Sequence, residues 1–367
     1  MKVCHLVYNL IRGGTEGQCA QVAMELTSRK LVDSIVAVFH RRGYYLSAVE
    51  KTCGKVYEFK IRKMFSMQTL AEIRNFAKFL RQEKVDVLHA WDADAIIFGQ
   101  FAARLAKCRF VASHRDLAEI YQMHKRLLFW HADKSAVAVA VNAEAIRDRL
   151  IQTKKVAAEK IHLLPNVLNV DVFRKEMTAE FSLKKRLPMG RRMVAVNRLE
   201  AEKNVSLLLH ALVLVRKEIP NAVLLIAGDG GQRRELEALA KKLGLTESVR
   251  FLGDILDVPA LLEECEVAAI VPNRNEGFSN ALMEYMMAGL PAMATDCGGN
   301  RELITHGKTG LLIPKQATPA EAAEAWKRLL TQQEEARQMA VAAKEHVIKL
   351  HALDFAIQKF VDFYAPL

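Results

Sequence analysis

The sequence of 367 residues contains no apolar run that approaches the roughly 18 residues needed to cross a bilayer as a helix. Its N-terminus reads as a strand and a loop, without the longer apolar region and small-residue cleavage site of a signal peptide. Its six cysteines are scattered and form no C-x-x-C pair, so neither a zinc site nor a disulfide framework is indicated. We therefore expect a cytoplasmic protein with reduced thiols.

Negative charge is scarce in the first half of the chain. Residues 1–170 hold 27 lysines and arginines against 16 aspartates and glutamates, whereas residues 193–367 hold 19 against 23. Such an asymmetry indicates an anionic partner for the first half, either nucleic acid or a membrane surface. A merely solvated surface explains the same bias.

Short apolar runs alternate with amphipathic helical patterns along the chain. Seven strand candidates precede residue 167, and helical spacing is clearest where Leu70, Ile73, Ala77 and Leu80 share one face. Runs that are apolar throughout suit parallel sheets covered on both faces. After the basic segment 178–192 the pattern begins again, which predicts an α/β protein with two facing Rossmann-like, doubly wound domains.

The expected boundaries follow from this repetition. The first domain spans residues 1–170, a linker 171–192, and the second domain 193–349. The tail from Pro319 is helical, and its last helix, about 350–367, is expected to cross back to the first domain.

The stretch EGFSNALMEYMMAGLP, which begins at Glu276, carries two glutamates eight residues apart. A helix is predicted over residues 281–288, with Ser279 or Asn280 as its N-cap. Glu276 then lies in the preceding loop and Glu284 on the second turn. Because the helix is apolar on every side, Glu284 is predicted to be buried, where it needs donors. A salt bridge to a buried arginine and contacts with ligand hydroxyls are both open.

In open α/β sheets, ligands bind beyond the carboxyl ends of the strands, where loops lead into helices. One such loop, NLIRGGTEGQ, follows the first strand. Gly13 and Gly14 there allow a close backbone approach, and Thr15 with Gln18 fits a capping box. A glycine pair in a turn is also ordinary loop chemistry.

A second loop, VNRLEAEKN, follows the first strand of the second half. Arg198 and Lys203 could both reach a phosphate at the next helix. Two surface cations without a ligand would give the same sequence pattern. The G-x-G-G of AGDGGQRREL is weak evidence for a nucleotide site.

These motifs together resemble the retaining glycosyltransferases of family four, which have the GT-B fold. Glu276 and Glu284 match the E-x7-E pair of that family, and Arg198 and Lys203 match its R-x4-K diphosphate grip. Other motifs follow in the family's order: GGTE at 13–16, Ser113-His114, LLPNVLNVDVF, GDGGQRREL, VRFLGDI, GGNRE and GKTGLLIP. The resemblance covers most of the chain, with its most specific motifs between residues 194 and 313.

The resemblance implies roles for these residues. Glu284 would bind the ribose hydroxyls of a nucleotide sugar, and Glu276 the hydroxyls of the sugar ring. Arg198 and Lys203 would neutralise the departing diphosphate, so that no metal ion and no cofactor are required. His114, at a strand end, is the candidate catalytic histidine. The other implied donor contacts are Gly13, Gly14, Glu16, Gly277, Phe278, Ser279 and Asn280.

Two residues depart from the family pattern, and one motif is a decoy. Asn197 stands where a glycine is usual before the arginine, and Val167 replaces the glycine of the P-N-G turn. Asp92 and Asp94 look like a D-x-D metal motif but are predicted to mark a loop and a helix start. His89, near the end of a strand, is a weaker functional candidate.

The leading interpretation is an enzyme that moves a sugar, with retention, from a nucleotide-diphosphate sugar to a glycan or glycolipid acceptor. Cell-envelope, exopolysaccharide or lipopolysaccharide biosynthesis is the expected context. Another GT-B enzyme, such as a nucleotide-sugar epimerase, is the enzymatic alternative. A basic nucleic-acid-binding protein is the non-enzymatic one, but the sequence lacks a recognised module for it, so we expect no nucleic acid.

An anionic membrane surface is the further partner that the basic first half favours. Lys60, Arg62 and Lys63 are the expected contacts, because apolar residues stand beside them. The protein would then work at the inner face of the cytoplasmic membrane. A solvated basic surface is an equally good explanation of the same residues.

Overall fold

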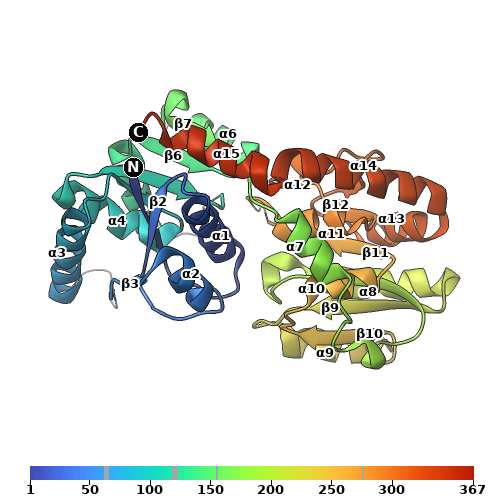
Figure 1. Cartoon of the computed structure of the whole chain (residues 1–367). Helices are drawn as coiled ribbons and strands as arrows, with labels where there is room; N and C mark the ends of the chain where they lie inside the picture. Colours follow the sequence, from blue (N-terminus) through green and yellow to red (C-terminus); the bar gives the residue numbers. More distant parts are fainter. Residues whose placement is uncertain (62–65, 118–122, 154–155, 275–276) are drawn as a thin grey trace. The chain divides into compact units, whose positions relative to one another are not determined.

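The computed structural model describes residues 1–61, 66–117, 123–153, 156–274 and 277–367, with the side chains of 123–126 outside the description. The chain forms two compact units. Unit 1 comprises Met1–Val167 and Leu353–Leu367, and unit 2 comprises Leu168–Ala352 (Figure 1). No helix within the described ranges combines the length and the apolar character needed to cross a membrane.

Unit 1 is built on a parallel sheet in the order β3-β2-β1-β4-β5-β6-β7. Its strands are β1 (Lys2–Val7), β2 (Asp33–Val38), β3 (Tyr57–Glu58), β4 (Val87–Ala90), β5 (Arg109–His114), β6 (Ala138–Val141) and β7 (Ile161–Leu163). Its helices are α1 (Gly14–Ser28), α2 (Leu46–Cys53), α3 (Met67–Gln82), α4 (Ala93–Ala106), α5 (Met123–Ser135), α6 (Glu144–Gln152) and α15 (Leu353–Tyr364). All seven strands predicted before residue 167 are present.

Unit 2 repeats this architecture with the order β10-β9-β8-β11-β12-β13. Its strands are β8 (Arg191–Val196), β9 (Ala222–Ala227), β10 (Val249–Gly253), β11 (Val267–Ile270), β12 (Ala292–Thr295) and β13 (Leu311–Ile313). Its helices are α7 (Val170–Met177), α8 (Val205–Glu218), α9 (Arg233–Lys242), α10 (Val258–Glu263), α11 (Asn280–Ala288), α12 (Asn300–Leu303), α13 (Pro319–Thr331) and α14 (Gln333–His351).

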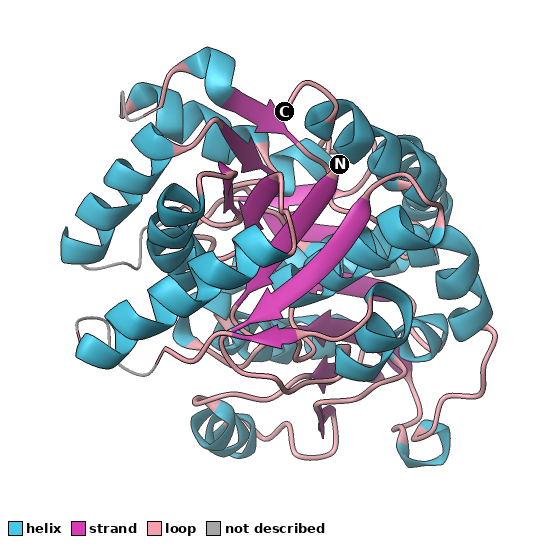
Figure 2. Cartoon of the chain, turned by 60° about the vertical axis from the view of Figure 1, so that its left-hand side comes forward, coloured by secondary structure: helices cyan, strands magenta, loops and turns pink. Residues whose placement is uncertain are grey.

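Helices cover both faces of these sheets (Figure 2). In β8, Met193 and Ala195 contribute to the core under α8, α9 and α13, whereas Val194 lies in the core under α10 and α11. Side chains of a strand alternate between the two faces, so a strand buried on both must be apolar throughout. The predicted pair of doubly wound α/β units is therefore confirmed.

The strand order gives each unit one point at which the chain direction across the sheet reverses. In unit 1 the chain runs outward in opposite directions from β1 and β4, and in unit 2 from β8 and β11. Loops at the carboxyl ends of such a central pair diverge and leave room for a ligand. The loops that follow β1, β4, β8 and β11 are therefore where a site is expected.

The last helix, α15, belongs to unit 1. Five of its side chains are buried in the core that also contains residues of α1 and the central strands: Ala356, Ile357, Phe360, Phe363 and Tyr364. Figure 1 shows this helix in red beside the green elements of unit 1. The expected return of the C-terminal helix to the first half of the chain is therefore observed.

The segment 171–192 is not the linker that its basic composition suggested. It lies inside unit 2, where α7 and the following turns bury Phe173, Phe181 and Leu187 against the core under α10 and α11. Its cations remain outside this core. The boundary lies at Val167–Leu168, because the apolar residues of the segment need the second sheet for their burial.

Two details of the predicted elements differ from the structure. The buried face of α3 includes Ile73, Ala77 and Leu80, as predicted, together with Thr69 and Phe76, whereas Leu70 is exposed. The predicted strands also omitted β12 and β13, which have four and three residues. Both strands are short, and two of the four residues of β12 are alanine, which is depleted in strands, so the sequence gives little strand signal there.

The predicted capping box at Thr15 and Gln18 is also absent. Gly13 is the N-cap of α1, with no side-chain cap hydrogen bond, so Thr15 lies inside the helix. Gln18 is buried and holds both backbone groups of Val167: its Nε2 donates to the Val167 oxygen at 3.0 Å, and its Oε1 accepts from the Val167 nitrogen at 2.5 Å. Gln18 thus fixes the end of the first segment of unit 1.

Two buried histidines lie under α15 in unit 1. Trp91 donates its indole N–H to His5 Nδ1 at 3.1 Å, and His89 Nδ1 lies 2.5 Å from the Tyr364 hydroxyl. Burial lowers the pKa of His5 to about 3 and lowers that of His89 well below its ordinary value. His89 is therefore a neutral core residue that anchors α15, and its weaker candidacy as a functional histidine is not supported.

The His5 shift predicts a specific loss of stability in acid. As pH falls below about 6.5, His5 becomes protonated in the unfolded chain. In the folded chain the same imidazole stays neutral until about pH 3. In this window the group removes about 1.4 kcal/mol of stability for each pH unit. His5→Gln should flatten the pH dependence of the unfolding free energy by that amount. Exposed His210→Gln serves as the control, and equal slopes in wild type and His5→Gln would refute the assignment.

One hydroxyl joins α11 to β8 in unit 2. The pairing of β8 with β11 covers Met193 and Val194, and beyond it the Val196 N–H donates to the Tyr285 hydroxyl at 2.6 Å. That hydroxyl lies 3.5 Å from the Val196 oxygen. Tyr285 is fully buried, and burial raises the pKa of its hydroxyl, which stays protonated. The contact fixes α11 against the carboxyl end of β8.

Tyr285→Phe should therefore destabilise unit 2 while preserving the shape of its core. The change keeps the ring but leaves the Val196 N–H without its acceptor, and a buried unsatisfied donor costs about 1–3 kcal/mol. Denaturant unfolding followed by circular dichroism measures the loss. Tyr44→Phe, at an exposed position, is the matched control. A Tyr285→Phe protein as stable as the control would show that the hydroxyl contact contributes nothing.

Candidate active site

The loop after β8 carries the two predicted cations. Arg198 is exposed and its guanidinium lies 3.9 Å from Glu202, a weak surface pair. Lys203 ends a short 3₁₀ turn directly before α8. The N-cap of α8, Asn204, has a left-handed conformation and makes no side-chain cap hydrogen bond. An uncapped helix N-terminus with two cations in the preceding loop is a favourable place for an anion.

The loop after β11 is joined to this one. The backbone N–H of Asn273 donates to the backbone oxygen of Glu202 at 2.9 Å. Its side-chain Nδ2 donates to the backbone oxygen of Ala201 at 3.4 Å. These bonds cross the central strand pair of unit 2. The Arg198 loop and the loop that leads to α11 therefore form one connected edge.

Helix α11 begins and ends as predicted. The Ser279 hydroxyl caps it by accepting from the Leu282 nitrogen at 3.2 Å, and Gly289 ends it with φ of 76°. Glu284 lies on its second turn but is half-buried, not buried as predicted. It shares a half-buried stripe with Ala281 and Ala288, whose small side chains leave the carboxylate accessible.

Glu276, the second glutamate of the pair, lies outside the described residues. The nearest described residues, Arg274 before it and Gly277 after it, contact the loop after β12. Gly299 donates its N–H to the Gly277 oxygen at 2.8 Å, and a Cβ at Gly299 would lie 2.2 Å from that oxygen. The buried Cys297 sulfur lies 3.5 Å from the Arg274 oxygen. No role was predicted for Cys297 from the sequence, although it directly precedes the glycine pair of the GGNRE motif.

In unit 1 the predicted glycine loop forms the start of α1. A Cβ at Gly13 would lie 2.2 Å from a Glu16 carboxylate oxygen, so glycine is needed for Glu16 to fold back over the helix start. Gly14 is the first residue of the helix and is exposed. Gly13, Gly14 and Glu16 therefore lie together at the carboxyl end of β1.

The Asp92 pattern marks a helix start, as predicted. Asp92 caps α4 by accepting from the Ala95 nitrogen at 2.9 Å, and it also accepts from the Tyr8 nitrogen at 2.5 Å. Burial raises the pKa of its carboxyl to about 7. Across the described parts of the chain, no three His, Cys, Asp or Glu side chains gather as a metal site would require.

His114 is the last residue of β5 and is only 8% exposed. Its Nε2 lies 2.7 Å from the buried Asp133 carboxylate on α5. Such a partner fixes the orientation of an imidazole and favours one tautomer. Asp133 was missed in the sequence, where it is one acidic residue within a basic helix.

A second polar cluster at this edge was also missed. Arg115 donates from Nη1 to Asn166 Oδ1 at 2.8 Å and from Nε to the Ser113 hydroxyl at 3.2 Å, and Asn142 donates to the same Asn166 oxygen at 3.1 Å. The guanidinium stacks on Trp91 at 4.4 Å, and burial lowers the pKa of Arg115 to about 10. Its position directly after His114 was the available signal.

The two departures from the family pattern do not require glycine here. Neither Asn197 nor Val167 has a positive φ. Asn197 is notable because both polar atoms of its side chain are buried without a hydrogen-bond partner among the described residues. An amide in that condition carries a desolvation cost.

The predicted membrane contacts are only partly visible. Lys60 is exposed and pairs with Glu58 at 3.3 Å, so its charge is partly compensated. Arg62 and Lys63 lie outside the described residues. This segment therefore gives no structural support for the predicted contact.

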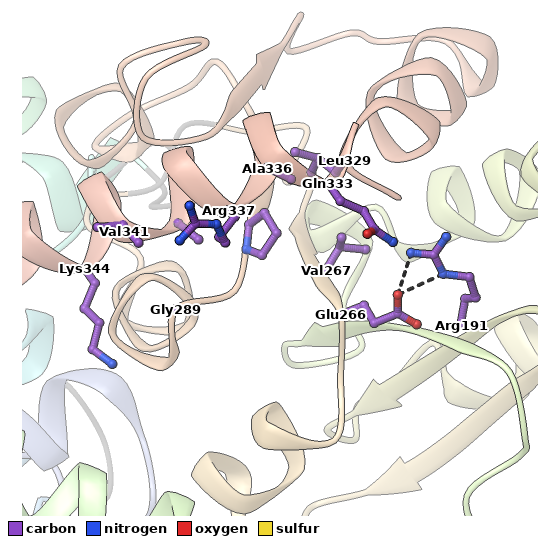
Figure 3. A pocket seen from close by; sticks show the side chains of 12 residues that line it. Arg191, Glu266, Val267, Gly289, Leu329, Gln333, Ala336, Arg337, Val341 and Lys344 are labelled. Carbon is purple, nitrogen blue, oxygen red and sulfur yellow. Dashed lines mark hydrogen bonds and ion pairs between the residues drawn. The ribbon is translucent and has the colours of Figure 1, made fainter. Parts of the chain in front are cut away.

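A cavity of about 410 Å³ lies elsewhere in unit 2. Figure 3 shows its lining: Arg191 and Glu266 point toward each other, and Arg337 and Lys344 extend from α14. Arg191 begins β8 and Val267 begins β11, so the cavity lies at the amino ends of the strands. It is therefore at the opposite edge of the sheet from the loops that carry Arg198 and Glu284.

Comparison with known proteins agrees with the motifs. A family model described as glycosyl transferases group 1 matches residues 179–346, and one described as glycosyltransferase family 4 matches residues 12–172. The Bacillus subtilis protein EpsD is 29% identical over 268 residues, 69% of each chain. A GDP-mannose-dependent mannosyltransferase acting on phosphatidylinositol monomannoside, from Mycobacterium tuberculosis, is 30% identical over 217 residues, 56% of each chain. The latter match spans little more than half of that relative.

Solved structures show the same architecture. Anabaena HepE in complex with UDP and glucose has a TM-score of 0.89 at 21% identity, with both chains fully covered. WaaG, described as a glycosyltransferase involved in lipopolysaccharide biosynthesis, has a TM-score of 0.74 at 16% identity, with 99% of each chain covered. The two family models divide the chain almost as its two units do, and the chain belongs to the group 1, or family 4, glycosyltransferases with the GT-B fold.

Proposed function

We propose that the protein transfers a sugar from a nucleotide-diphosphate sugar to a glycan or glycolipid acceptor, with retention at the anomeric carbon. The observation that carries this proposal is the edge of unit 2 where Arg198 and Lys203 precede the uncapped N-terminus of α8. HepE, which shares the fold, was solved with UDP and glucose. A Mycobacterium tuberculosis relative is GDP-mannose-dependent, so both UDP and GDP are candidate nucleotides.

The diphosphate is the group that this edge suits best. In transfer from a nucleotide sugar, negative charge develops on the departing diphosphate. Arg198 and Lys203 supply positive charge in one loop, and the first amides of α8 point the same way. Because Arg198 is exposed and only weakly paired, it can turn to the ligand at little cost. We infer that these groups make a metal ion and any other cofactor unnecessary.

The glutamate pair would divide the rest of the donor. Glu284, half-buried on α11, is accessible to the ribose hydroxyls, and Glu276 in the preceding loop would hold hydroxyls of the sugar. The backbone of Gly277, Phe278, Ser279 and Asn280 leads into α11 beside them. The Gly299 N–H and the Cys297 sulfur contact the backbone oxygens of Gly277 and Arg274.

Unit 1 would supply the acceptor side and complete the donor contacts. We propose that His114, with its ring held by Asp133, acts at the reacting sugar as a catalytic residue. Gly13, Gly14 and Glu16 lie at the carboxyl end of β1, where a close backbone approach is possible. By analogy with WaaG, the product would enter cell-envelope, exopolysaccharide or lipopolysaccharide biosynthesis on the cytoplasmic side of the membrane.

Arg198→Ala and Lys203→Ala should each reduce turnover far more than stability. Loss of one preorganised charge contact in a transition state costs ~3–4 kcal/mol, or roughly two to three decades in rate. Steady-state transfer assays and thermal unfolding measure the two effects. Arg234→Ala, which removes an exposed cation from α9, is the control. Near-normal kinetics in both loop variants would remove the proposed diphosphate grip.

Glu284→Gln should weaken binding of the free nucleoside diphosphate, whereas Glu276→Gln should spare that binding and impair sugar transfer. The reason is that free nucleotide contains the ribose but not the transferred sugar. Isothermal titration calorimetry with the diphosphate, combined with transfer assays, separates the two. Glu263→Gln, exposed on α10, controls for the loss of one negative charge. Equal affinity losses in both variants would contradict the division of roles.

A further inference from the structure

Four large apolar side chains are exposed together on helices α4 and α5 of unit 1: Phe101, Leu105, Leu127 and Trp130. Leu127 is 61% exposed and Trp130 39% exposed. We name these four residues the α4–α5 patch. Single exposed apolar residues are ordinary, but a group on two adjacent helices marks an interaction surface.

Side-chain contacts join the two helices beside the patch. His131 Nδ1 lies 2.6 Å from Gln100 Oε1, and the rings of His131 and Phe101 stack with centroids 6.4 Å apart. Leu127 lies one turn before His131 on α5, and Leu105 lies one turn after Phe101 on α4. The opposite face of α5, with Phe129 and Ala132, is buried in unit 1. The face of α5 that carries Leu127 and Trp130 therefore does not contribute to the core of unit 1.

Exposed cations lie on or directly after the two helices that carry the patch. The Lys134 ammonium lies 3.7 Å from the centre of the Trp130 ring, and Arg104 and Lys107 are exposed at the end of α4. The one acidic residue of α5, Asp133, is buried against His114. The exposed charge beside the patch is thus positive.

We propose that unit 1 docks on an anionic lipid surface through the α4–α5 patch. The apolar side chains would enter the headgroup region, with Trp130 at the boundary, while the cations contact lipid phosphates. This surface differs from the segment around Lys60 that the sequence favoured. It explains part of the basic surplus of the first half.

Two other occupants fit less well. A symmetric pair of chains would place the same patch, with its lysines and arginines, against itself, and like charges would face each other. A nucleic acid would satisfy the cations but would leave the aliphatic side chains of Leu105 and Leu127 without apolar partners. An anionic bilayer meets both the apolar and the cationic requirement.

The chain contains its own reporter for this docking. Of its three tryptophans, Trp91 and Trp326 are fully buried, so Trp130 alone is exposed. We expect the emission of the whole protein to shift to shorter wavelength with vesicles of phosphatidylcholine and phosphatidylglycerol. Lipids brominated on their acyl chains should quench that emission. Vesicles of phosphatidylcholine alone should produce much smaller changes.

Variants separate the apolar from the ionic contribution. Leu127→Ser should abolish the shift of Trp130, because the neighbouring anchor is lost from an exposed position that does not affect folding. Lys134→Gln and Arg104→Gln should each weaken vesicle co-sedimentation about fivefold. Lys51→Gln, on the exposed side of α2, and Met189→Ser, exposed in unit 2, are the matched controls.

The proposal is wrong if anionic vesicles leave the emission unchanged and the protein in the supernatant at low salt. It is also wrong if the shift occurs without lipid and follows protein concentration, which would indicate a second copy on the patch. Binding that Leu127→Ser leaves intact would place the lipid contact elsewhere. Docking is measured without donor or acceptor, so its failure leaves the proposed sugar transfer standing, and the reverse holds.

Discussion

The hydrogen bond between Val196 and Tyr285 is the constraint on which the carboxyl edge of unit 2 depends. It lies where β8 has passed the end of its pairing with β11, and it replaces the partner that the strand has lost. Because Tyr285 follows Glu284 directly, the bond holds the α11 backbone at Glu284 close to the carboxyl end of β8. Arg198 and Glu284 can therefore belong to one site although 85 residues separate them in the sequence.

Much of this edge could be predicted because its signals are local. The capping of α11 by Ser279 and its end at Gly289 follow from residue types that favour those conformations. The degree of burial of Glu284 could not be predicted, because it depends on which stripe of an all-apolar helix faces outward. The roles of Tyr285, Asp133 and Gln18 depend on partners distant in sequence. Segment 171–192 was wrongly predicted to be a linker because its composition is basic. The few apolar residues that pack it against unit 2 were not recognised.

The excess of cations in the first half of the chain belongs to unit 1, where individual cations have different surroundings. Its cations do not form one uniform basic face: Arg115 is stacked on Trp91 beside a strand end, Lys60 is paired with Glu58, and Lys134 covers Trp130. The composition gives the number of excess cations in this half but does not show which groups surround each of them. The exposed group beside the α4–α5 patch combines cations with apolar side chains, which is what an anionic lipid surface can use.

We propose above all that the carboxyl edge of unit 2 binds a nucleoside diphosphate through protein cations and a helix N-terminus. The most direct measurement is thermal unfolding of the wild-type protein with UDP, GDP or ADP, each with and without a metal chelator. A ligand that binds only the folded state raises its melting temperature. We predict that one diphosphate gives such a rise and that the chelator leaves it unchanged. A melting temperature that none of the three raises, or a rise that the chelator abolishes, would contradict the account.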